Sequence, residues 1–243
     1  MGNLHAQKLP VYAVMNLVTH PIQDVLYNRL THERGAFLFA GPFGSGKHHY
    51  MLEAAHRLNE SGRQVYWVDC GSMRGRDECN VASKISRVIG YGDVKDMDDL
   101  LIKTRALTRP TTFFFSGMHL SLLLDTKVLD AALYIANSGP SVIFASSRPE
   151  ECKMILERGD AQLLCEPILG RWDKSHFLQF IEKNSVSRRW DPERKERYAE
   201  ILALSGTADD AAMIVHSCLG EEQLANNMRL MGLRWDKFSG LSK

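Results

Sequence analysis

The sequence predicts an α/β fold, in which a parallel, doubly wound, five-stranded sheet is followed by a small all-helical domain. Three observations lead to this prediction. Short apolar runs alternate with amphipathic helical patterns through the first part of the chain, as in repeated βα units. A glycine-rich loop joins the first apolar run to the helix after it. After Pro167 the patterns are helical, so we expect domains at residues 1–167 and 168–243.

The first strand and the helix after it are the clearest elements. Residues 36–40, Ala-Phe-Leu-Phe-Ala, form a continuous apolar run, as expected of a parallel strand buried on both faces. A helix at residues 22–30 precedes this strand. The helix predicted at residues 47–59 has one apolar face, because its apolar residues recur at spacings of three and four: Met51, Leu52, Ala55 and Leu58.

The same alternation continues along the chain. Four further strands are predicted at residues 64–68, 111–115, 141–145 and 161–164. The helices that accompany them are predicted at residues 77–89, 96–108, 127–137 and 149–158. Helical patterns in the second domain cover residues 173–183, 192–204, 208–219 and 221–230. Since the strands of such a sheet end at one edge, we expect a ligand at their carboxyl ends.

The composition is typical of a soluble globular protein, with 44% hydrophobic and 24% charged residues. A formal net charge of +1 predicts no bulk attraction to nucleic acid or to a membrane surface, and no apolar stretch is long enough to predict a membrane span. The five cysteines are scattered and form no C-x-x-C pair, which indicates reduced thiols in a cytoplasmic or other reducing compartment. The histidine spacings predict no metal centre.

Residues 41–49 read Gly-Pro-Phe-Gly-Ser-Gly-Lys-His-His, and this stretch is the most informative in the chain. It has the G-x-x-x-x-G-K frame of a phosphate-binding P-loop, in which backbone N–H groups and a helix N-terminus converge on a phosphate. The flanking strand and helix favour this interpretation over an ordinary glycine-rich turn. The predicted nucleotide-binding residues are Gly41, Pro42, Phe43, Gly44, Ser45, Gly46, Lys47, His48 and His49.

His48 stands where a P-loop normally carries a Ser or Thr hydroxyl that coordinates Mg²⁺. Lys47 and the loop amides can bind a diphosphate without that metal ligand. Two roles for His48 stay open. It either hydrogen-bonds a phosphate oxygen, more strongly when it is protonated, or fills space with His49 at the start of the helix.

This order of elements resembles the AAA+ and STAND branches of the P-loop ATPases, in particular the origin-recognition, secretion-type and NB-ARC-like members, which have a helical lid after the nucleotide-binding core. In these ATPases the Walker B strand ends in Asp-Glu. Here the third predicted strand is followed by Ser116-Gly117, so both carboxylates are absent. The resemblance therefore implies a degenerate active site: Ser116 cannot hold Mg²⁺ through its water shell, and Gly117 cannot polarise an attacking water.

The resemblance also assigns expected roles to three further residues. Ser147 and Arg148 follow the fourth strand, where the family places its sensor 1, although a turn before Pro149 explains them equally well. Arg158 stands where many AAA+ proteins carry an arginine finger, although it also suits a helix C-terminus. In the lid, Asp209 and Asp210 stand where relatives carry a sensor 2 arginine.

The function that the resemblance implies is that of a pseudo-ATPase: an assembly or regulatory subunit that binds ATP or ADP independently of Mg²⁺. Its expected partners are proteins, either further copies of itself in a homo-oligomer or an active ATPase relative, and no membrane. Two alternatives remain. One is a DNA-associated AAA+ regulator that contacts DNA through basic residues around Trp190, and the other is a weakly active ATPase or kinase that uses Asp69 or Asp125 as a displaced carboxylate.

Overall fold

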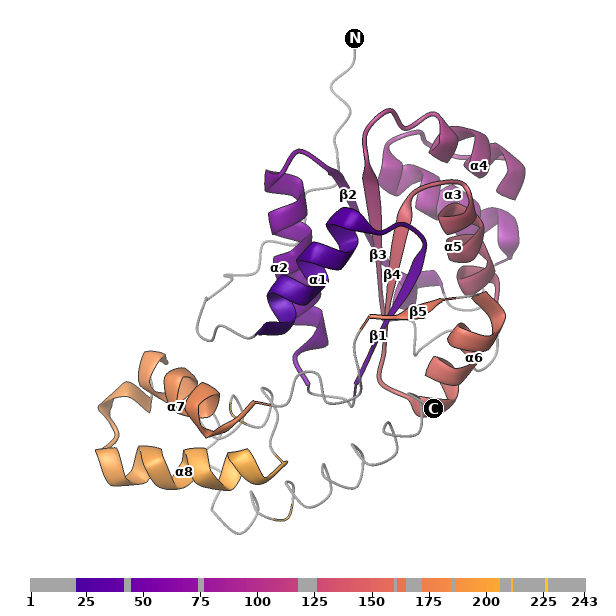
Figure 1. The fold of residues 1–243 in the computed structure, drawn as a ribbon. Helices are drawn as coiled ribbons and strands as arrows, with labels where there is room; N and C mark the ends of the chain where they lie inside the picture. Colours follow the sequence, from indigo (N-terminus) through magenta and orange to yellow (C-terminus); the bar gives the residue numbers. More distant parts are fainter. Residues whose placement is uncertain are drawn as a thin grey trace.

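The computed structural model describes residues 21–41, 45–73, 77–117, 126–159, 161–164, 172–184 and 187–205, together with Ala211 and Asn226. A five-stranded parallel sheet runs through its centre, in the strand order β2-β3-β4-β1-β5. Helices lie on both faces of this sheet (Figure 1). The predicted fold class, a doubly wound parallel α/β core, is therefore confirmed.

The strands are β1 (Ala36–Ala40), β2 (Gln64–Asp69), β3 (Thr111–Ser116), β4 (Ser141–Ser146) and β5 (Gln162–Leu163). The first four begin at the predicted residues and end within one residue of the predicted ends. β1 lies between β4 and β5, and its last residue, Ala40, pairs with Ser146. β5 is shorter than predicted, because it pairs with β1 only at Phe37 and Leu38.

The helices are α1 (Pro21–His32), α2 (Lys47–Glu60), α3 (Glu78–Ile89), α4 (Met97–Arg105), α5 (Lys127–Asn137), α6 (Pro149–Gly159), α7 (Lys174–Lys183) and α8 (Pro192–Ser205). α4 ends three residues before its predicted end. Leu107 donates its N–H to the carbonyl oxygen of Thr104 in a tighter turn, and its side chain packs against the core. Apart from Ala211 and Asn226, the helices predicted at residues 208–219 and 221–230 lie outside the described residues.

Two short 3₁₀ turns, η1 (Cys70–Met73) and η3 (Ser187–Arg189), were not predicted from the sequence. Turns of three or four residues are too short to leave a periodic pattern. η1 follows the carboxyl end of β2, and η3 joins α7 to α8.

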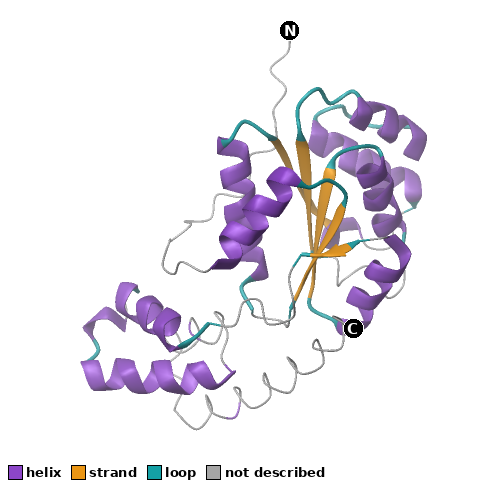
Figure 2. Cartoon of the chain, viewed as in Figure 1, coloured by secondary structure: helices purple, strands orange, loops and turns teal. Residues whose placement is uncertain are grey.

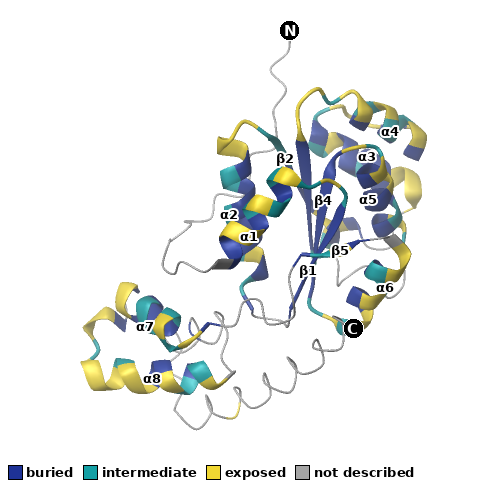
Figure 3. Cartoon of the chain, in the orientation of Figure 1, coloured by how far each residue is buried: buried dark blue, intermediate teal, exposed yellow. Residues whose placement is uncertain are grey.

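Successive side chains of each strand enter two separate hydrophobic clusters. Leu38 and Phe115 belong to the cluster that also contains residues of α3, α5 and α6. Phe39 and Phe114 belong to the cluster built with α1 and α2. The central strands β1, β3 and β4 are accordingly buried on both faces, as Figure 3 shows by their colour. The continuous apolar runs in the sequence result from this double burial.

The residues after 171 form helices and loops in the described part of the chain (Figure 2). α7 and α8 pack together around a cluster of their own, which includes Trp172, Phe177 and Tyr198. Trp172 donates its indole N–H to the hydroxyl of Tyr50 on α2, so the helical part contacts the helix that follows the P-loop. Burial raises the pKa of Tyr50 to about 12.

Within the described residues, no helix has both the length and the apolar character needed to cross a membrane. Cys70 and Cys152 are buried thiols, and Cys79 is exposed; Cys165 and Cys218 lie outside the described residues. Burial raises the pKa of Cys152 to about 11, so its thiol stays protonated at neutral pH.

Candidate functional site: a P-loop without its metal ligands

The P-loop begins at the carboxyl end of β1, in the centre of the sheet. Gly41 donates its N–H to the carbonyl oxygen of Ser146 over 3.2 Å, which continues the β1–β4 ladder by one residue. The first residue of the loop is thereby fixed beside the end of β4, where the sequence predicts sensor 1. The carboxyl edge of a parallel sheet is where such folds bind their ligands.

The loop ends in a left-handed glycine. Gly46 has φ 78° and ψ 9°, a conformation that glycine adopts without steric cost, and it precedes the first residue of α2. Gly46 has no side chain that could accept hydrogen bonds from the first N–H groups of α2. The Gly46 carbonyl oxygen accepts the N–H of Tyr50, which is the first hydrogen bond of the helix. The N–H groups at the start of α2 are therefore suited to an anion.

Lys47 is the first residue of α2, and its side chain turns back into the loop. Its Nζ lies 2.7 Å from the carbonyl oxygen of Gly41 and 3.2 Å from Oγ of Ser45. Lys47 is 7% exposed and Ser45 is 1% exposed. The ammonium is thus held inside the loop that would surround a phosphate. The remaining predicted loop residues, Pro42, Phe43 and Gly44, lie outside the described residues.

His48 and His49 follow Lys47 on α2 and contact aromatic rings. His48 meets Trp67 of β2 edge-on, with 5.1 Å between ring centroids, and His49 meets Tyr50 in the same manner. Desolvation by burial lowers the pKa of His48, and it lowers that of His49 with a smaller contribution from the charge of His48. Both imidazoles are therefore neutral at pH 7 and above.

Ser116 and Gly117, which the sequence analysis places at the Walker B position, lie at the end of β3, beside β2. Ser116 is buried, and its hydroxyl donates to the carbonyl oxygen of Val68. Gly117 has φ 71°, a left-handed backbone that costs about 1–2 kcal/mol for a residue with a side chain. The backbone at this position therefore disfavours the glutamate that a complete Walker B motif would carry there.

Asp69 is the carboxylate next to these positions. It is the β-ladder partner of Ser116, and its Oδ1 lies 3.6 Å from the place where a Cβ at Gly117 would be. The same oxygen accepts the N–H of Gly71 over 3.0 Å. Asp69 is exposed, so the displaced-carboxylate alternative has a candidate at the expected edge of the sheet. Asp125, the other candidate, lies outside the described residues.

These residues do not fit a magnesium ion of the kind that AAA+ ATPases use. Mg²⁺ prefers oxygen ligands in octahedral geometry, whereas position 48 carries an imidazole packed on Trp67 and position 116 a buried hydroxyl bonded to the backbone. The described residues also contain no group of three or more His, Cys, Asp or Glu placed to hold a metal ion.

At the end of β4 the structure adds a residue that the sequence analysis missed. Ser146 donates its hydroxyl to Oε2 of Glu151 over 2.9 Å, and Arg148 donates its N–H to the same hydroxyl over 3.3 Å. Glu151, on α6, is fully buried. Oε1 of Glu151 lies 3.8 Å from Nε of Arg148. Glu151 stands in the first turn of α6, where acidic residues are common, so the sequence alone carries no signal for this role.

Ser147 and Arg148, the residues predicted as sensor 1, are thus placed next to the P-loop by the β1–β4 pairing. Arg148 is 49% exposed at its side chain, and its guanidinium is drawn towards the buried Glu151. To reach a bound phosphate it would exchange this ion pair for a new one. Ser147 is half-buried.

Arg158, the candidate arginine finger, is held within its own chain. Its Nε lies 3.1 Å from Oδ1 of Asp130 on α5, and its Nη2 donates to Oδ2 of the same residue. The side chain is still 47% exposed. Asp209 and Asp210, at the expected sensor 2 position, lie outside the described residues.

Trp190, the aromatic residue of the basic stretch, is a packing residue. Its ring lies 5.4 Å from that of Tyr198, and the guanidinium of Arg194 lies 4.2 Å above it. Arg188 and Arg189 on η3 are exposed. The stretch therefore presents cations to solvent but no open aromatic face.

Comparison with solved structures supports the fold. The chain is similar to the Orc1 protein of Aeropyrum pernix in complex with DNA, with a TM-score of 0.60 and 14% identity over 91% of this chain and 67% of that one. It is also similar to DnaA of Aquifex aeolicus bound to AMPPCP, with a TM-score of 0.49 and 12% identity over 91% and 69% of the two chains. No protein-family model and no curated protein sequence matches the chain.

The likeness to Orc1 supports the predicted fold class, a doubly wound parallel α/β core. This chain spans about two thirds of the length of both solved structures.

The Ser146–Glu151 hydrogen bond makes the first prediction. Replacing Ser146 by Ala removes a donor from a fully buried carboxylate, which lowers the free energy of unfolding by about 1–3 kcal/mol. Urea denaturation of the Ser146→Ala variant measures the loss. The matched control is Ser147→Ala, which we expect to change stability by less than about 0.5 kcal/mol. Equal losses in the two variants would contradict this account.

The lowered pKa of His48 makes the second prediction. Because the imidazole loses its proton below the ordinary value of about 6.5, ATP affinity measured by calorimetry should stay constant between pH 7 and pH 8. Any increase in ATP affinity that results from protonation of His48 should appear only below pH 7, and it should disappear in the His48→Gln variant. An affinity that falls steadily from pH 7 to pH 8 and depends on His48 would show the opposite shift.

Proposed function

We propose that this protein is a pseudo-ATPase: a subunit that binds ATP or ADP at residues 41–49, independently of Mg²⁺, and that regulates or supports a protein assembly. The observation that carries the proposal is the contrast within one site. Lys47 is buried in the loop with its ammonium beside Gly41 and Ser45. The positions that would hold the metal and the attacking water carry His48, Ser116 and Gly117.

Phosphate binding needs only parts that are present. The ammonium of Lys47, the N–H groups at the start of α2 and the left-handed Gly46 supply positive charge and hydrogen-bond donors. Hydrolysis needs more. In an active ATPase the metal and the water-positioning group each lower the activation barrier of hydrolysis by several kcal/mol. This is about the contribution of one oxyanion-hole donor or of a Lewis acid in other enzymes. We therefore propose binding with very slow turnover or none.

The assembly role rests on the same contrast, since a subunit without turnover can act through its surfaces. We propose that residues 1–167 form the nucleotide-binding core and residues 168–243 a helical lid. Trp172 and Tyr50 join the lid to α2, so that nucleotide at the start of α2 would bias the lid position. The partners are further copies of this chain or an active ATPase relative, and Arg158 would leave Asp130 to act as a finger in such an assembly.

Calorimetric titration of ATP and ADP into wild type and Lys47→Ala tests the proposal, together with a steady-state assay of phosphate release. We expect wild type to bind, Lys47→Ala to lose at least tenfold in affinity, and neither to release phosphate above the background. Glu60→Ala, an exposed residue at the far end of the same helix, is the control and should bind within about threefold of wild type.

Turnover in wild type that disappears in Asp69→Asn, with binding kept, would replace this proposal by the weakly active ATPase or kinase. The position of Asp69 beside Ser116 makes it the carboxylate to test. Absence of binding at millimolar nucleotide would reject nucleotide binding altogether.

A second candidate function is that of a DNA-associated regulator. It is favoured by the exposed cations of η3 and α8, namely Arg188, Arg189, Arg194 and Arg197, and by the fold shared with an initiator whose structure contains DNA. If these residues contact phosphates, duplex binding should weaken steeply between 50 and 200 mM salt, and the salt slope should fall by about 1 for each contact removed.

Fluorescence anisotropy with a labelled duplex measures this dependence in wild type and in Arg188→Gln/Arg189→Gln. The double variant Arg87→Gln/Lys153→Gln is the control, because it removes the same charge from exposed positions on α3 and α6. Equal affinities in the two variants, or no binding at 50 mM salt, would eliminate DNA binding by this stretch.

A further inference from the structure

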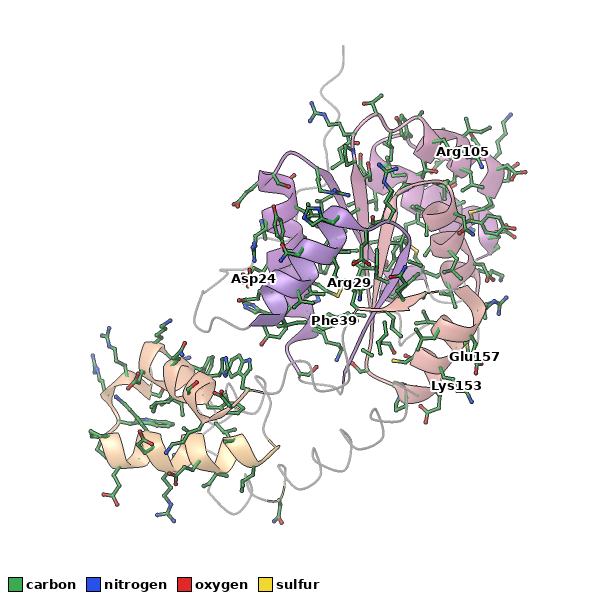
Figure 4. The ribbon with its side chains drawn as sticks, in the orientation of Figure 1. Asp24, Arg29, Phe39, Arg105, Lys153 and Glu157 are labelled. Carbon is green, nitrogen blue, oxygen red and sulfur yellow. The ribbon has the colours of Figure 1, made fainter. Side chains whose placement is uncertain are left out.

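A second basic site lies at the opposite edge of the sheet from the P-loop. A cavity of about 370 Å³ opens beside the amino ends of β2, β3 and β4. Four arginines line it, each in a segment that leads into a strand or ends a helix there: Arg34, Arg63, Arg105 and Arg109. Figure 4 shows one of them, Arg105, at the end of α4, at the other end of the core from Lys153 on α6.

The charges in this cavity are not balanced by carboxylates. Among the described residues that line it, none is acidic, and none of the four arginines forms an ion pair within the described part of the chain. Arg29 and Arg57, by contrast, are paired with Glu33 and Asp24.

Arg63 carries the strongest sign of an unmet interaction. One end of its guanidinium is fixed, because Nη1 donates to the carbonyl oxygen of Thr31 over 3.0 Å. Its Nε is buried and has no hydrogen-bond acceptor among the described residues. Burial, followed by the neighbouring charge of Arg34, lowers the pKa of Arg63. A buried N–H without an acceptor destabilises the protein, and an anion in the cavity would offset this cost.

The other lining residues suit a polar ligand. Thr108, Ser138 and Ser141 place hydroxyl-bearing side chains around the arginines, and Leu107 and Pro110 add apolar surface. The cavity volume falls within the range of about 300–1,000 Å³ that is typical of small-molecule sites. Guanidinium groups bind phosphate oxygens in pairs of parallel hydrogen bonds, so several arginines around one hollow favour phosphate groups.

We propose that this cavity binds a small molecule with two or more linked phosphate groups, at a site separate from the P-loop. The charges of the four arginines that line this one hollow match the roughly three to four negative charges of a linear triphosphate. A nucleic acid backbone spreads its phosphates along an extended path and is matched by a stripe of cations. The converging arrangement therefore favours the compact ligand.

The test is calorimetric titration of sodium tripolyphosphate into the full chain, without Mg²⁺, in a Lys47→Ala background that removes the P-loop contribution. We expect one binding site to remain. Adding Arg34→Gln/Arg109→Gln should weaken it at least tenfold. These two side chains are exposed and no hydrogen bond or ion pair of theirs is recorded in the described structure, so their removal should leave the melting temperature unchanged or higher.

The matched control adds Arg87→Gln/Lys153→Gln to the same background. It removes two exposed charges elsewhere on the core and should bind tripolyphosphate within twofold of Lys47→Ala alone. A further variant, Arg34→Lys/Arg109→Lys, keeps the charge but loses the paired donors, and its affinity should fall severalfold while the fold is retained.

Three results would overturn the proposal. The first is that tripolyphosphate does not bind to Lys47→Ala, and the second is that Arg34→Gln/Arg109→Gln and its control Arg87→Gln/Lys153→Gln weaken this binding equally. The third applies if Arg34→Gln/Arg109→Gln is unfolded: Arg34→Lys/Arg109→Lys then binds tripolyphosphate with full affinity. A single-stranded oligonucleotide is titrated in parallel. If the oligonucleotide binds more tightly than tripolyphosphate, and its binding depends on Arg34 and Arg109, the site binds a nucleic acid backbone and the small-ligand proposal is wrong. These outcomes are independent of whether the P-loop binds nucleotide.

Discussion

The site depends on the parallel pairing of β1 with β4. This pairing places Ala40 opposite Ser146 and lets Gly41 bond to the Ser146 carbonyl, so the P-loop begins beside the end of β4. The neighbouring pairings bring Ser116 and Asp69 to the same edge. Because β1, β3 and β4 are buried on both faces, a shift of register would move large apolar side chains out of both clusters at once. The hydrophobic core therefore fixes the geometry of the site.

The parts of the site differ in what maintains them. In the proposed site, the half that would bind phosphate is made of backbone N–H groups, a left-handed glycine and one lysine, and it follows from the strand–loop–helix arrangement itself. Hydrolysis would depend on individual side chains, and positions 48, 116 and 117 carry His, Ser and Gly instead of the expected metal ligands and carboxylate. At Gly117 the left-handed backbone also disfavours a side chain. A fold of this kind can lose hydrolysis while it keeps the capacity to bind nucleotide.

The sequence was sufficient to predict the features that depend on local or strongly periodic patterns of residues. The apolar runs placed four strands to within a residue, and the glycine spacing located the loop that contains Lys47. It was not sufficient for contacts that exist only after the strands are ordered. Glu151 stands in the first turn of a helix, where acidic residues are common, yet it is a buried acceptor for Ser146. The four arginines of the second cavity come before β1, β2 and β3 in the sequence. They line one hollow because the strand order β2-β3-β4-β1 brings the amino ends of these strands to the same edge of the sheet.

The most direct test of the central claim is the ratio of ATP dissociation constants in excess EDTA and in excess Mg²⁺, measured by calorimetry on the wild-type chain. A site that binds phosphate through Lys47 and backbone N–H groups alone should give a ratio within about threefold of one, or less than about 0.7 kcal/mol. Binding at least a hundredfold weaker in EDTA would mean that a carboxylate holds the metal, and it would contradict the account of a P-loop that works without one.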